Sequence, residues 1–156
     1  MATPTERERV TTSPNDLKTA GSQSFAAQPR DSFLTRGLAA AGIAAVVNLG
    51  ILGVATLAGA SMRVTPPPGS SMQISIMPVL LMSLMPFTVS LLITWLLARH
   101  WPRVTSPLAW AGLAFAVVST ASPLLLADDL GARISLALMH LVVGIAWFVA
   151  VRRGRA

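Results

Sequence analysis

The sequence contains no cysteine and no tyrosine, and only 12% of its 156 residues are charged. Without cysteine the chain can form no disulfide, no thiolate metal site and no thiol nucleophile. A soluble domain usually carries about twice this charged fraction. The charged residues are also unevenly placed, because four stretches lack Asp, Glu, Lys and Arg altogether. These stretches are 37–62, 64–98, 104–127 and 134–151.

Each uncharged stretch has the length and composition of a membrane-spanning helix. The stretches contain 26, 35, 24 and 18 residues, and about 20 apolar residues cross a bilayer as an α-helix. We therefore predict an all-α integral membrane bundle of four transmembrane helices, at 37–60, 76–98, 107–127 and 134–151. The same composition excludes a soluble enzyme, a secreted disulfide-stabilised domain and a nucleic-acid-binding domain.

The N-terminal segment has a different composition. Residues 1–33 are rich in Thr, Ser, Pro, Gln and Ala, and a segment with so little apolar content cannot bury a core. We predict a disordered cytoplasmic tail at 1–33, followed by the four-helix transmembrane domain at 34–156.

The basic residues predict the orientation in the membrane. Ten of the twelve Lys and Arg residues lie before the first predicted helix, between the second and third, or after the fourth. The other two, Arg63 and Arg133, lie in the remaining loops. Because Lys and Arg accumulate on the cytoplasmic side, we expect both termini to be cytoplasmic. The net charge of +6 is then a topology signal and does not indicate nucleic acid as a partner.

His140 is the one ionisable residue inside a predicted span, and such residues usually face the interior of a bundle. Because a short turn joins the third and fourth helices, Ser119, Thr120 and Ser122 are expected at the depth of His140. The histidine either senses protons or binds a ligand, or it is a neutral imidazole hydrogen-bonded between helices.

Asn48 lies at the middle of the first predicted helix. A lone asparagine in a span either bonds across a helix interface or contributes a polar ligand to a cavity. Pro86 and Pro123 fall inside predicted helices and are expected to bend them. We therefore predict a small polar pocket in the outer leaflet. Its expected ligand-binding residues are Asn48, Ser83, Ser119, Ser122 and His140.

The sequence shows no pattern that favours a catalytic site or a metal site. Asp128 and Asp129 are about two or three helical turns from the depth of His140, and no nucleophile elbow is present. Methionine thioethers can bind Cu(I), but Met62, Met72 and Met77 form no tight repeat. We predict a protein that is not an enzyme and that has no metal site and no cofactor.

Several short motifs mark the predicted helices. They are Arg36-Gly37-Leu38-Ala39, Asn48, Ser119, Ser122-Pro123-Leu124 and Met139-His140-Leu141. With these motifs the chain resembles, over about residues 33–151, a family of small, uncharacterised four-helix integral membrane proteins of actinobacteria, a domain of unknown function. The resemblance implies the four-helix topology and a bacterial plasma membrane, and it implies no reaction.

These observations favour a non-enzymatic structural or accessory subunit in the plasma membrane. Small residues recur at helical spacing, as at Ala40 and Ala44 in the first helix and Ala109 and Gly112 in the third. Such faces let helices approach closely, so the expected partners are the lipid bilayer and another membrane protein or a second copy. The alternative is a small transporter or ligand-binding protein that uses the polar pocket around His140 and Asn48.

Overall fold

The computed structural model describes residues 29–153. Their elements follow one another along the chain as α2 (Pro29–Leu57), β1 (Arg63–Val64), β2 (Met72–Gln73), α3 (Ile76–His100), a 3₁₀ turn η1 (Pro102–Val104), α4 (Thr105–Ser119), α5 (Ala121–Leu126) and α6 (Leu130–Arg153). Within these residues, four helical segments are long and apolar enough to cross a membrane. They are Phe33–Leu57, Ile76–His100, Pro102–Leu126 and Leu130–Arg153. The predicted all-α fold with four spans is confirmed.

The first helix differs from its predicted bounds at both ends. It begins at Pro29, so its first five residues belong to the predicted tail, and proline is a favourable first residue of a helix. Residues 1–28 of that tail lie outside the described residues. The helix ends at Leu57 because Gly59 adopts a left-handed conformation with φ 86°. The amides of Gly59 and Ala60 then donate to the carbonyls of Thr56 and Ala55, at 3.1 and 3.0 Å, which is a Schellman cap.

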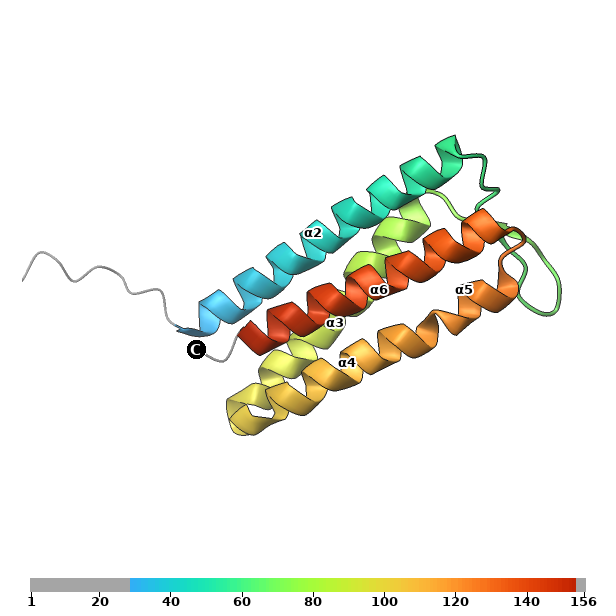
Figure 1. Ribbon diagram of the computed structural model, residues 1–156. Helices are drawn as coiled ribbons and strands as arrows, with labels where there is room; N and C mark the ends of the chain where they lie inside the picture. The colour runs from blue at the N-terminus through green and yellow to red at the C-terminus, as the bar shows by residue number, and fades with distance from the viewer. Residues whose placement is uncertain (1–28, 154–156) are drawn as a thin grey trace, which may run out of the picture.

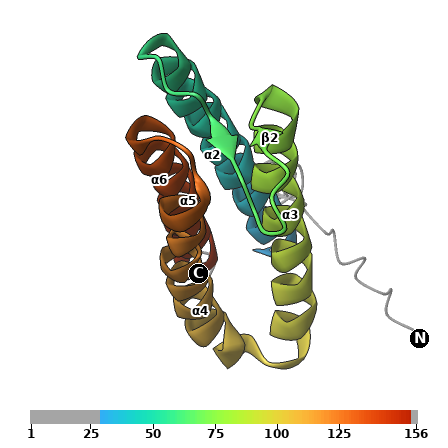
Figure 2. The same ribbon diagram turned by 90° about the vertical axis from the view of Figure 1, so that its right-hand side faces the viewer.

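The helices lie in a curved row in the order α3, α2, α6, α4 (Figures 1 and 2). The first turn of α2 and the last turn of α6 lie at one end of the fold, and the β1–β2 hairpin and α5 lie at the other (Figure 1). α2 contacts α3 and α6, and α6 also contacts α4 and α5. The last helix of the chain is therefore the one with the most neighbours.

Close helix approaches depend on glycine. A Cβ added to Gly144 in α6 would lie 2.4 Å from the Cβ of Ala116 in α4, and one added to Gly37 would lie 2.4 Å from the Leu91 side chain. A Cβ on Gly112 would meet the Trp147 ring at 2.1 Å. The small-residue faces of the first and third predicted helices thus pack inside this chain.

The third span is interrupted near the end that lies beside the hairpin, as the position of Pro123 predicts. α4 ends at Ser119 and α5 begins at Ala121. Proline has no N–H to donate to the carbonyl four residues earlier, which here belongs to Ser119. The hydroxyl of Thr120 donates to the Val117 carbonyl at 2.6 Å across the interruption. Pro86, by contrast, lies inside a continuous α3.

Large apolar side chains cover the outside of the helices. Leu57, Met82, Phe115 and Leu125 are 91%, 75%, 74% and 77% exposed. Apolar side chains exposed to this extent are compatible with contact to the hydrocarbon of a bilayer, in which they lose no free energy by facing outward.

Candidate functional site

Asn48 is the central polar residue of the fold. Its side chain is 2% exposed, and its Nδ2 donates to the Ser83 hydroxyl of α3 at 2.9 Å. The same group donates to the Met139 carbonyl of α6 at 3.4 Å. Within the described residues, Asn48 Oδ1 is buried without a hydrogen-bond partner. Asn48 therefore connects three helices through their polar atoms.

His140 lies half-buried on α6, next to Met139. Its Nδ1 is 2.8 Å from the Leu136 carbonyl, and a carbonyl can only accept, so the geometry assigns the proton to Nδ1. The face of α6 that carries His140 also carries Gly144 one turn later, and Gly144 contacts Ala116 of α4.

The other three predicted site residues have different surroundings. Ser83 is buried against Asn48, Ser119 is half-buried, and Ser122 is exposed. Of the five, the structure joins Asn48 and Ser83 directly. None of the five lines the groove described next, or a smaller apolar depression of about 310 Å³ on α3. Ligand binding at these residues stays a prediction.

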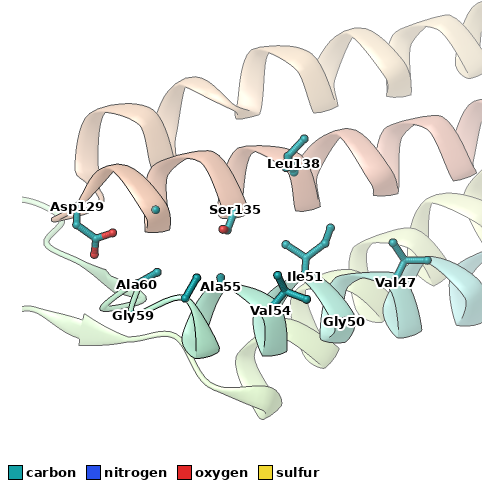
Figure 3. Close-up of a pocket in the computed structure, with 12 residues that line it drawn as sticks. Val47, Gly50, Ile51, Val54, Ala55, Gly59, Ala60, Asp129, Ser135 and Leu138 are labelled. Atoms are coloured by element: carbon teal, nitrogen blue, oxygen red, sulfur yellow. The ribbon is translucent and has the colours of Figure 1, made fainter.

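A groove of about 630 Å³ lies between α2 and α6, in the half of the fold nearest the hairpin (Figure 3). Most of its lining side chains are aliphatic, and they include Ile51 of α2 and Leu138 of α6 (Figure 3). The polar groups in its lining are the side chains of Ser135 and Asp129. Its lining residues are Val47, Gly50, Ile51, Val54, Ala55, Ala58, Gly59, Ala60, Asp129, Gly131, Ser135 and Leu138.

Asp129 closes the polar end of this groove and caps α6. Its Oδ1 accepts from the Ala132 amide at 2.8 Å, and its Oδ2 accepts from the Ser61 amide at 2.9 Å and from the Ser61 hydroxyl. The Ser61 hydroxyl, followed by the Ala132 and Ser61 amides, lowers the pKa of Asp129 from its ordinary value of 3.8. These hydrogen bonds to the Asp129 carboxylate therefore stabilise the folded protein fully above pH 3.8. Their contribution is lost as the pH falls through the lowered pKa of Asp129.

The hairpin is joined to the α5–α6 turn by further hydrogen bonds. Thr65 donates its amide to the Leu126 carbonyl at 3.0 Å, and Asp128 donates its amide to the Arg63 carbonyl at 3.1 Å. The Thr65 hydroxyl donates to Asp128 Oδ1 at 2.9 Å. The loop between the first two spans is thus ordered against the turn between the last two.

Sequence reasoning missed the groove and the role of Asp129. An aspartate directly before an apolar helical run is a typical N-cap, and this signal was available at Asp129. The groove had no comparable signal, because it depends on which faces of α2 and α6 remain apart. Among residues 29–153, no cluster of three His, Asp or Glu side chains could hold a metal ion.

Four apolar helices of membrane-spanning length, with aliphatic side chains outward, define a multi-pass membrane protein. The sequence matches a family of unknown function, DUF6069, over residues 28–156. The chain belongs to this family. No curated protein and no solved structure matches it.

Proposed function

We propose that this chain is a non-enzymatic accessory subunit of a bacterial plasma membrane, which binds another membrane protein through one face of α2. This glycine face consists of Ala39, Gly42, Val46 and Gly53. The four residues recur at helical spacing on one side of the helix. A Cβ added to Gly42 or Gly53 would have no atom within 4 Å.

The glycine face is the observation that carries the proposal. Glycine inside a helix costs about 0.5–1 kcal/mol relative to alanine, and the glycines at Gly37, Gly112 and Gly144 offset that cost by close packing. Gly42 and Gly53 have no such contact within the described chain. A second helix approaching this face would supply it, because small residues allow close helix packing in membranes.

Substitution of Gly42 by leucine tests this role. The full chain is extracted gently from its own membranes and weighed by native mass spectrometry. We expect the wild type to retain a second, different polypeptide and Gly42→Leu to retain about tenfold less of it, which corresponds to about 1.4 kcal/mol. The matched control is Ala111→Leu, which adds the same bulk at an exposed position on α4. A wild type that carries no other polypeptide contradicts the accessory role.

The orientation proposed with this role places both termini in the cytoplasm. One end of the fold holds the first turn of α2 and the last turn of α6. The arginines at this end are Arg36, Arg99, Arg103, Arg152 and Arg153. At the hairpin end, Arg63 and Arg133 are balanced by Asp128 and Asp129. This distribution of arginine supports the cytoplasmic placement of the first end.

Single cysteines test the orientation cleanly, because the sequence has none of its own. We expect a membrane-impermeant maleimide to label Ser70→Cys in intact cells, because Ser70 is exposed in the hairpin. Ala156→Cys should react only after the cells are permeabilised. If Ala156→Cys were labelled in intact cells and Ser70→Cys were not, the proposed orientation would be wrong and the C-terminus would lie outside the cell.

A further inference from the structure

We propose that the groove between α2 and α6 binds one phosphatidylethanolamine molecule, with an acyl chain along the groove and its ammonium group beside Asp129. The groove runs along α6 from Asp129 to Leu138, a rise of about 12–14 Å. One leaflet of hydrocarbon is about 15 Å thick. The groove therefore has about the length of a single leaflet, and Asp129 lies at one end of it (Figure 3). This placement would bring the carboxylate to the level of the lipid headgroups.

The groove ends where α2 and α6 come together, and this favours a lipid over a spanning helix. Toward the termini, Ala41 and Ala44 of α2 and Ala150 and Val151 of α6 are buried. A partner helix would need a seat along the whole height of the two helices. The open part of the groove is only as long as one leaflet is thick, and this length matches an acyl chain.

Small residues keep the groove open. Gly50, Ala55 and Ala58 of α2 contribute little side-chain volume to its wall, and a Cβ added to Gly50 would meet no atom within 4 Å. The lining is otherwise aliphatic, so it offers dispersion contacts to an alkyl chain and few hydrogen bonds.

The charge at the polar end selects the headgroup. Asp129 has no ion-pair partner among residues 29–153, although two arginines lie nearby in the sequence. Arg133 donates its Nε to the Ala127 carbonyl, and Arg63 donates its Nε to the Gln73 side chain. Ser61 and Ala132 donate hydrogen bonds to the carboxylate of Asp129, and a backbone hydrogen bond from Gly131 also lowers its pKa. These donors are neutral, so the negative charge of the carboxylate has no counter-charge and attracts an ammonium group at the end of the groove.

The test compares lipids on the full-length protein. The purified chain is equilibrated with equal amounts of phosphatidylethanolamine and phosphatidylglycerol of identical acyl chains, and bound lipid is counted by native mass spectrometry. An exposed ion pair is worth up to about fivefold in affinity. We therefore expect one phosphatidylethanolamine per chain, retained about three- to fivefold over phosphatidylglycerol.

A matched pair of leucine variants locates the site. Gly50→Leu places a side chain in the groove, whereas Ala111→Leu adds a leucine at an exposed position of α4 outside the groove lining. We expect about tenfold less bound lipid in Gly50→Leu and unchanged binding in Ala111→Leu. Asp129→Asn should abolish the preference between the lipids, whereas Asp128→Asn, which removes the neighbouring charge, should preserve it.

Three outcomes would overturn the proposal. They are equal retention of the two lipids by the wild type, equal loss in the two leucine variants, and a dimer that carries no lipid and dissociates in Gly50→Leu. The last result would assign the groove to a second copy of the chain. The lipid comparison requires no substitution at Asp129, so it stands even if Asp129→Asn weakens the α6 cap. The inference does not depend on the accessory role.

Discussion

Replacement of Gly144 by leucine should lower the free energy of unfolding in detergent by about 3 kcal/mol or more. Even a methyl group at this position would lie 2.4 Å from the Cβ of Ala116. Ala116 is part of a helix and has no rotatable side chain to move aside, so α4 and α6 must separate. Overpacking of a buried site typically costs about 1–3 kcal/mol, and leucine adds three more carbon atoms than alanine.

The same substitution at Gly42 is the control for this prediction. Gly42 lies in a helix of similar length, and an added Cβ there has open space around it. We expect its unfolding free energy to stay the same or to rise by up to about 1 kcal/mol, because leucine has a higher helix propensity than glycine. If Gly144→Leu and Gly42→Leu unfolded alike, the close approach of α4 and α6 would be wrong.

Substitution of Asn48 by alanine should cost about 2 kcal/mol of unfolding free energy. The change removes the hydrogen bonds to Ser83 and to the Met139 carbonyl, and it leaves a cavity where α2, α3 and α6 meet. Interhelical hydrogen bonds in membranes contribute about 0.6–2 kcal/mol, and the cavity adds to that loss.

A double-mutant cycle separates the hydrogen bond from the cavity. Asn48→Ala combined with Ser83→Ala should show a coupling of about 0.5–2 kcal/mol, because the two side chains are in contact. Ser90→Ala provides the matched control, since Ser90 is an exposed serine on the same helix as Ser83. Additive effects of Asn48→Ala and Ser83→Ala would show that their hydrogen bond contributes nothing to stability.

The spans could be predicted from the sequence because a bilayer excludes charge. The four uncharged stretches contain most of the four helices, and Pro123 predicted the interruption that falls at Thr120. The β1–β2 hairpin was not predicted. Its strands have two residues each, which is too short for alternation of apolar and polar residues to indicate a strand.

The candidate site was predictable only in part, and the reason is rotation about the helix axis. Counting residues from a turn gives depth in the membrane, and depth alone placed Ser119, Ser122 and His140 together. It does not say which way a side chain points, and Ser122 is exposed. Asn48 and Ser83 could be grouped from polarity, because a polar side chain in a span usually turns toward another polar atom. The groove could not be predicted, because it depends on how α2 and α6 pack against each other and not on the type of any single residue.

The position of α6 in the row of helices has a consequence for biosynthesis. A chain enters the membrane from its N-terminus, so α2 and α3 are inserted first. They can pair at once through Gly37 and Leu91 and through Asn48 and Ser83. The other flank of α2 and most of the packing face of α4 must wait for α6, which lies between them and is synthesised after both. Until α6 is inserted, Asn48 lacks its Met139 acceptor and α4 lacks its main packing partner. A chain that stops before residue 130 therefore leaves α2 paired with α3, and α4 packed against them through few contacts.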